Sequence, residues 1–255
     1  MQQSTWRVTH CSVQGASHIK SNDPCQDYSE CRECGSILLA AVADGAGSAS
    51  ESLKGATIAC KTSLDVLENA VRKCPPRSDE DWKKIISDAF STAREAVFAE
   101  ALNIKKPARE LACTLIILAA CPERAVAGQI GDGAALVANG TGELVTLTRP
   151  AETEYLNQTT FLTGDEALGS LQVSCFTGPV RSIAMFTDGL QMLALKMPDA
   201  KPHHPFFAPL LKFMAAEQDS ARRVEQLQKF LTSPKLTERA DDDLTLLLAT
   251  RPGEV

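Results

Sequence analysis

The stretch ILLAAVADGAGS, residues 37–48, decides the fold of this chain. Its first seven residues, 37–43, are all apolar, which is typical of a strand that is buried on both faces. Asp44-Gly45 follows at once, and residues 50–73 then show leucine and isoleucine at helical spacing. Because a helix follows instead of a returning strand, Asp44-Gly45 is more than a hairpin turn. The pattern predicts a carboxylate fixed at the end of a buried strand.

Two further strand-like runs meet aspartates in the same way. Asp188 follows the apolar part of the run 180–187 and is itself followed by leucines at helical spacing. Asp242 and Asp243 directly precede the run 244–250. Carboxylates that converge from several strand ends would repel each other, and a bound divalent cation relieves that repulsion. Since oxygen-only ligation suits Mg²⁺ or Mn²⁺ better than zinc, the sequence predicts a site for one of these ions.

Asp132-Gly133 is a weaker instance of the pattern. It lies between the strand-like runs 124–131 and 134–138, where this dipeptide fits a plain hairpin turn. Gly45 has a further use, because a residue without a side chain lets its carbonyl approach a metal. Two ions about 3.5–4 Å apart share a water, lower its pKa and direct it at a phosphorus atom.

The rest of the chain alternates hairpins with long helices. Ser78, followed by three acidic residues, predicts a helix start, and that helix extends to about residue 102. Two more helical patterns cover 206–232, and residues 148–171 form a long loop without periodicity. Long helices among antiparallel hairpins favour an α+β fold. The remaining strand-like runs are 6–14, 111–121, 124–131, 134–138 and 143–147.

Composition narrows the class of protein. A chain of 255 residues is compatible with one domain. The net charge of −6 and the scattered basic residues disfavour nucleic acid as a partner. No apolar stretch approaches the roughly 18 residues of a membrane helix, and the N-terminus lacks a secretory signal. Nine cysteines cannot all pair, which favours a cytoplasmic location, and Cys31-x-x-Cys34 lacks the second ligand pair of a structural zinc site.

Six short motifs stand along the chain: QD (26–27), VADGAG (42–47), CTL (113–115), GDG (131–133), FTDGL (186–190) and DDLT (242–245). In this order they resemble the metal-dependent Ser/Thr protein phosphatases (PPM, type 2C) in their bacterial form. The resemblance covers about residues 6–250 and implies a four-layer αββα sandwich, two antiparallel sheets flanked by helices. It also implies that 1–255 is a single phosphatase domain.

The resemblance implies a site for two Mn²⁺ or Mg²⁺ ions. Asp44 corresponds to the carboxylate that bridges them, and the Gly45 carbonyl binds one of them. Asp188 and Asp242 correspond to the other direct ligands. The ions activate the water that bridges them, and this water attacks phosphoserine or phosphothreonine without a phosphoenzyme. Asp44, Asp188 and Asp242 are then catalytic through that water.

Two outer residues complete the implied metal set. Asp27 corresponds to an acidic residue that binds through metal-bound water. Asp132, together with Asp188, corresponds to the site of a third and weaker ion in bacterial members. The loop 148–171 falls where the family has a mobile flap, and we expect it to gate the substrate.

Three positions depart from the family pattern. Gln26 replaces an acidic residue, Asn22 stands where a phosphate-clamping arginine is common, and Ala46 replaces a histidine found in some eukaryotic members. His18 or Lys20 is therefore the expected donor to the phosphate.

Three functions remain open at this point. The first is an active phosphatase that acts on a phosphorylated protein, either a Ser/Thr kinase or its target, in bacterial signalling. The second is a catalytically weak pseudophosphatase that binds a phosphoprotein as an adaptor. The third is a structural domain in which the aspartates only form turns, and it predicts that Asp188→Asn leaves metal affinity unchanged.

Overall fold

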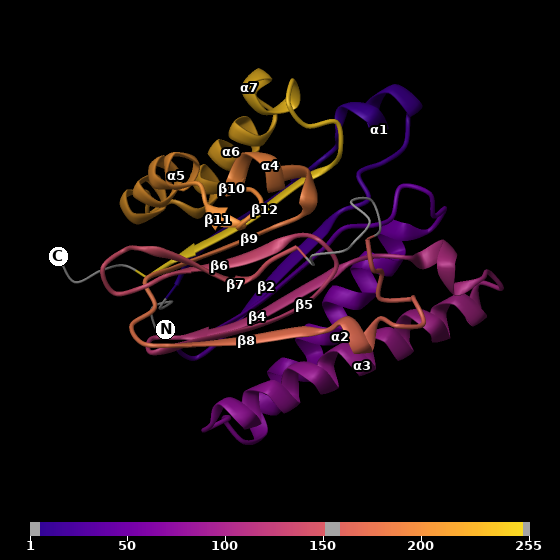
Figure 1. Cartoon of the computed structure of the whole chain (residues 1–255), viewed down its shortest axis with the longest axis horizontal. Helices are drawn as coiled ribbons and strands as arrows, with labels where there is room; N and C mark the ends of the chain where they lie inside the picture. Colours follow the sequence, from indigo (N-terminus) through magenta and orange to yellow (C-terminus); the bar gives the residue numbers. More distant parts are fainter. Residues whose placement is uncertain (1–5, 151–158, 252–255) are drawn as a thin grey trace.

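The computed structural model describes residues 6–150 and 159–251, and it shows two antiparallel sheets stacked face to face between two layers of helices (Figure 1). The predicted αββα sandwich is therefore confirmed. Sandwiching explains why the strands are so apolar, because each sheet has one face against the other sheet and one against helices.

The first sheet has the strand order β1-β12-β9-β6-β7, and all neighbouring strands are antiparallel. Helices α4, α5, α6 and α7 cover its outer face, drawn in orange and yellow in Figure 1. A two-stranded ribbon of β10 and β11 adjoins them. The strands are β1 (Arg7–Val13), β6 (Ala134–Ala138), β7 (Leu144–Thr148), β9 (Ser182–Phe186), β10 (Leu195–Lys196), β11 (Lys201–Pro202) and β12 (Leu244–Thr250). The helices are α4 (Gln191–Ala194), α5 (His204–Ala216), α6 (Ser220–Leu231) and α7 (Pro234–Thr237).

The second sheet has the order β2-β3-β4-β5-β8, and the long helices α2 and α3 pack on its outer face. The helix start expected at Ser78 is confirmed as a capping box, in which the Ser78 side chain accepts from the Asp81 N–H and Asp81 accepts from the Ser78 N–H. The elements are β2 (Tyr28–Cys34), β3 (Ile37–Ala43), α2 (Ser52–Lys73), α3 (Asp79–Asn103), β4 (Leu115–Cys121), β5 (Arg124–Ile130) and β8 (Gln172–Thr177).

The side chains of strand β3 contribute to two hydrophobic cores, one between the sheets and one under the helices α2 and α3. Leu38 and Val42 pack between the sheets, whereas Leu39 and Ala43 pack toward α2 and α3. This alternation follows from the two-residue period of a strand. Every residue of β3 after Ile37 is inaccessible to solvent, which confirms the prediction of a strand buried on both faces.

Two predictions about the strands are wrong. The run 111–121 becomes a strand only at Leu115, because Ala108–Leu111 form a 3₁₀ turn (η1). Asp132-Gly133 does not close a hairpin, because β5 and β6 belong to different sheets and are not hydrogen-bonded to each other. Gly131, with φ of +116°, lets the chain cross from one sheet to the other.

Several short elements carry no periodicity that predicts them. They are the six-residue helix α1, the ribbon of β10 and β11, and β8, whose residues are only partly buried. Within the described residues, no helix is long and apolar enough to span a membrane. The bounds not yet given are α1 (Ala16–Ser21), η2 (Leu168–Ser170) and η3 (Asp188–Leu190).

Cys31 and Cys34 lie on β2 and pack on opposite faces of the sheet, Cys31 toward the inter-sheet core and Cys34 toward the helical layer. A three-residue separation on a strand imposes this arrangement. The two thiols therefore do not converge on one point as a metal-binding pair would.

Candidate active site

Three strand-end aspartates converge at one end of the sandwich. Asp44 follows β3, Asp132 follows β5, and Asp188 follows β9, so two come from one sheet and one from the other. One carboxylate oxygen of each lies within 4.8 Å of those of the other two. The site therefore sits across the gap between the sheets, and neither sheet could form it alone.

Asp27 lies beneath this group and is 4% exposed. Its Oδ2 accepts hydrogen bonds from the hydroxyls of Thr187, at 2.8 Å, and Thr245, at 2.7 Å. Its Oδ1 is buried and has no hydrogen-bond partner. A buried carboxylate oxygen without a partner is costly unless a ligand completes it.

Burial and mutual repulsion act on all these carboxylates. Burial first, and then the neighbouring charges, raises the pKa of Asp188 to about 7. Burial also raises the pKa of Asp27 to about 7, although the threonine hydroxyls oppose the shift. The pKa of Asp44 is raised well above its usual range by burial and by Asp27 and Asp188. A bound cation would favour the charged form of these carboxylates at neutral pH.

The residues present fit a divalent ion. All the side-chain donors are carboxylate oxygens, the set that Mg²⁺ and Mn²⁺ prefer. Asp132 repeats the feature seen at Asp27, because its Oδ1 is also buried without a hydrogen-bond partner. Asp27 Oδ1 and Asp132 Oδ1 therefore both lack a partner, which a bound cation would supply.

Contacts with neighbouring segments fix the positions of Asp44 and Gly45. The Asp44 N–H donates to Thr114 Oγ1 at 2.9 Å, and the Thr114 N–H donates to the Asp44 carbonyl at 2.8 Å. A Cβ at Gly45 would lie 2.6 Å from the Gln26 carbonyl oxygen, so only glycine fits between these segments.

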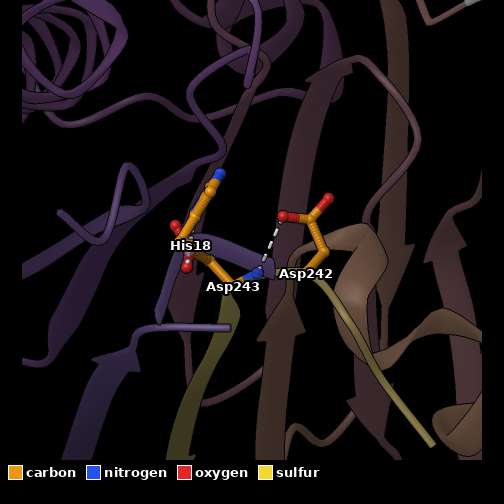
Figure 2. A group of neighbouring side chains, drawn as sticks. All are labelled: His18, Asp242 and Asp243. Atoms are coloured by element: carbon orange, nitrogen blue, oxygen red, sulfur yellow. Dashed lines mark hydrogen bonds and ion pairs between the residues drawn. The ribbon is translucent and has the colours of Figure 1, made fainter. Parts of the chain in front are cut away.

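Asp242 and Asp243 have different environments, although they are adjacent (Figure 2). Asp242 is exposed, and its Oδ1 accepts from the Asp243 N–H at 2.8 Å. Asp243 is 2% exposed and accepts from the backbone N–H groups of Gly15, at 2.7 Å, and Gln26, at 2.6 Å. Asp243 therefore joins three chain segments and has its oxygens occupied, while Asp242 remains available to a ligand.

His18 and Lys20 both lie on α1. His18 is buried, and its Nδ1 lies 2.9 Å from Asp243 Oδ1. Burial lowers the pKa of His18, but the bond to Asp243 and the charges of Asp242 and Asp23 outweigh it, so the net shift is upward. The Lys20 side chain is exposed on the surface of the helix.

Residues 14–232 match the family model for protein phosphatase 2C. The chain is 36% identical over 252 residues to serine/threonine-protein phosphatase 3 of Escherichia coli strain K12, covering 96% of this chain and 98% of that one. This chain belongs to the protein phosphatase 2C family. It is an enzyme, a serine/threonine phosphatase of this type, and phosphoproteins are its substrate class.

Solved structures agree on the fold of this protein phosphatase 2C chain. PppA, a key regulatory component of the T6SS in Pseudomonas aeruginosa, superposes with a TM-score of 0.65 at 19% identity, covering 97% of this chain and 98% of that one. RsbX in complex with magnesium superposes with a TM-score of 0.55 at 14% identity, covering 98% of each chain. The family is metal-dependent, with Mn²⁺ or Mg²⁺, and the acidic cluster is consistent with this.

The long loop of the phosphatase contacts the site at Asp132. Residues 151–158 of the expected flap 148–171 lie outside the described residues. Of the described part, Thr159 donates its hydroxyl to Asp132 Oδ2 at 2.5 Å. Arg94 on α3 donates to the carbonyls of Leu162, at 3.1 Å, and Gly164, at 3.2 Å.

Sequence patterns missed the supporting residues of the phosphatase site. Thr187 and Thr245 lie inside the quoted motifs FTDGL and DDLT, but a threonine at a strand end is usually interpreted as β-propensity and not as a donor to a buried acid. The position of Asp243 next to Asp242 indicates that it lies near the site. Its role could not be predicted, because it depends on contacts with residues more than 200 positions away.

Proposed function

We propose that two Mn²⁺ or Mg²⁺ ions bind at Asp44, the Gly45 carbonyl, Asp188 and Asp242, and that they serve the hydrolysis of phosphoserine and phosphothreonine. Asp27 supports this set from below through an intervening water. Asp242 lies in a second group, in which its carboxylate is within 4.8 Å of His18 and Asp243, and its charge raises the pKa of Asp44 and Asp188. The observation that carries the proposal is the convergence of the Asp44, Asp132 and Asp188 carboxylates, from both sheets, to within 4.8 Å. Their raised pKa values and the open oxygen of Asp27 support it.

Asp132 is the proposed ligand of a third ion, shared with Asp188. Its Oδ1 is the second open oxygen of the cluster, and Thr159 occupies its Oδ2. We expect this site to be weaker than the other two, because one oxygen of Asp132 is already engaged by a hydroxyl.

The chain's own residues orient the reaction. When bound, the ions lower the pKa of water and neutralise the phosphate charge. Asp44 and Asp188 would be deprotonated beside the charge of the ions, and the hydrogen bonds from Thr187 and Thr245 favour the charged form of Asp27. The rigid strand ends hold these groups in place, so little reorganisation is needed when the substrate binds.

His18, and not Lys20, is the proposed donor to the phosphate. Asp243 holds its Nδ1, which fixes the ring, and its Nε2 lies 3.7 Å from the position of a Cβ at Gly47. The second ring nitrogen is thus left facing the loop that follows Asp44. The exposed Lys20 has no such restraint.

The proposed partner is a Ser/Thr kinase or its phosphorylated target in bacterial signalling. The proposed single phosphatase domain has its core at about 6–250. The odd number of cysteines, all free thiols in the structure, supports action in the reducing environment of the cytoplasm.

The test is phosphate release from a phosphothreonine peptide and from p-nitrophenyl phosphate, with Mn²⁺, with Mg²⁺ and with EDTA. We expect metal-dependent turnover, and a loss of at least about 100-fold in Asp44→Ala and Asp188→Asn. Asp199→Asn, at an exposed position with only a surface ion pair, is the matched control. Tight Mn²⁺ binding without turnover would favour the adaptor function, and unchanged Mn²⁺ affinity in Asp188→Asn would favour the structural one.

A further inference from the structure

A cavity of about 680 Å³ lies beside the metal-binding cluster, between the segment 23–26 and the segment 47–58 at the start of α2. It adjoins the site directly. A Cβ at Gly45 would lie 2.6 Å from the Gln26 carbonyl oxygen and 2.8 Å from the Ser52 Cβ, so two wall residues pack against the residue that follows Asp44.

Two polar side chains in the wall of this cavity have an atom without a hydrogen-bond partner. Ser52 is 1% exposed and its Oγ has no hydrogen-bond partner. Gln26 is 9% exposed and its Oε1 also has none. Buried polar atoms without partners are rare in native proteins, and one explanation is a ligand that completes them.

The N-terminus of α2 adds donors to the same wall. The helix is 22 residues long and begins at Ser52 without a capping side chain. The Ser52 N–H donates to the Ala49 carbonyl at 3.4 Å, so the N–H groups of the first turn that remain available to an acceptor are those of Leu53 and Lys54. The cavity therefore offers an acceptor at Gln26 and donors at Ser52 and the helix start.

A free anion is a poor fit, although a helix N-terminus attracts one. Asp23 and Glu51 line the same cavity, and their carboxylates oppose a negative ligand. Lys54, also in the wall, is engaged by Glu51 at 3.5 Å. A neutral ligand with alternating donors and acceptors fits better, and a peptide main chain has that chemistry.

We infer that this cavity binds the main chain of the phosphoprotein substrate on one side of the phosphorylated residue. The inference rests on the proposed function, because the phosphate must occupy the neighbouring metal site. A substrate N–H donates to Gln26 Oε1, and a substrate carbonyl accepts from Ser52 Oγ. The enzyme thereby favours polypeptide substrates over small phosphate esters, whatever side chains flank the phosphorylated residue.

The experiment compares wild type with Ser52→Ala on three substrates: p-nitrophenyl phosphate, free phosphothreonine, and blocked phosphothreonine peptides extended on one side or the other. For wild type, we expect kcat/KM to rise with extension on one side only. In Ser52→Ala, we expect kcat/KM for the extended peptide to fall about three- to tenfold, with p-nitrophenyl phosphate unchanged.

Stability supplies a second readout. Because Ser52 Oγ has no partner in the free protein, Ser52→Ala should not lower the melting temperature. Ser63→Ala is the matched control on the same helix: Ser63 is fully buried, but its hydroxyl donates to the Cys60 carbonyl at 2.9 Å. We expect Ser63→Ala to lower the melting temperature and to leave the preference for peptides intact.

Three results would overturn the inference: equal kcat/KM for free phosphothreonine and all peptides, a parallel loss on p-nitrophenyl phosphate in Ser52→Ala, or no loss on the peptides. Each leaves the phosphatase function standing. An enzyme inactive on every substrate with Mn²⁺ would instead overturn the proposed function, and this inference with it.

Discussion

Two threonine hydroxyl groups favour the charged form of Asp27, a buried acid of this site. Thr187 and Thr245 place both of their hydroxyls on Asp27 Oδ2. Burial raises the pKa of Asp27, and these two hydrogen bonds are the largest influences that oppose the rise. Since a protonated Asp27 would not support a cation, the threonines act on metal binding without contacting the metal.

Thr245→Val tests this role. We expect Mn²⁺ affinity to fall about 10-fold, because the isosteric side chain removes one donor and the pKa of Asp27 rises further. Isothermal titration with Mn²⁺ measures the change.

Thr250→Val on the same strand is the control for that variant. Thr250 is also buried and bonded, to Ser182 at 2.9 Å, but it lies at the opposite end of β12. It should lose comparable stability and keep its metal affinity. Equal loss of affinity in both variants would show that the effect is a general loosening of the strand.

At the scale of elements, long periodic segments were predictable and short or edge segments were not. The burial of β3 and the start of α3 follow from apolar runs and a capping signal, which act locally. Strand β8 is an edge strand with partly buried residues, so no alternation marks it. The segment at Asp132, where the chain crosses between the sheets, was predicted as a hairpin turn. An Asp-Gly dipeptide occurs in both kinds of connection, and they differ only in whether the two strands belong to the same sheet.

Helix α3 also holds the loop that reaches Asp132. Arg94, stacked on Phe98, donates to two carbonyls of the segment that follows Thr159. We expect Arg94→Ala to speed chymotryptic cleavage in the loop 148–171 several-fold, because both hydrogen bonds are lost together. Limited proteolysis followed by mass spectrometry locates the cut.

Arg109→Ala is the comparison for that variant, since Arg109 is 83% exposed in its side chain and lies near the same end of α3. Cleavage in the loop should match wild type. If Arg94→Ala also left the loop as resistant as in wild type, the two carbonyl contacts would not be what restrains it.

For the whole molecule, the carboxylate cluster makes stability depend on pH and on metal together. Asp27 and Asp188 have pKa values of about 7 in the folded metal-free protein, against an ordinary value of 3.8. Between these values the folded chain binds more protons than the unfolded chain, so stability falls as the pH rises. In EDTA we therefore expect a lower melting temperature at pH 7.5 than at pH 5.5.

Mn²⁺ should reverse that trend, because the ions replace the protons and bind more tightly as the carboxylates ionise. Thermal unfolding by circular dichroism, with and without Mn²⁺, measures both curves. His18 contributes in the same direction, since its pKa is raised too, so Asp27→Asn/Asp188→Asn isolates the carboxylates. A melting temperature in EDTA that rises from pH 5.5 to 7.5 would contradict the expectation.

Much of the molecule could thus be inferred from its sequence, but not the contacts that close the site. Motif order predicted the sandwich and its family, and strand-end aspartates predicted where acids gather. The hydrogen bonds of Asp243 to Gly15 and Gln26 join positions 228 and 217 residues apart. No local pattern encodes such pairings, because they exist only after both sheets have stacked.

The position of β12 has a consequence for how the enzyme is made. This strand follows every other described element in the chain, yet it pairs with β1 on one side and β9 on the other. During translation β1 is synthesised more than 200 residues before β12, so it stays without this partner strand until β12 follows. Asp242 and Asp243 arrive with that strand. A nascent chain therefore stays without phosphatase activity until β12 has been synthesised.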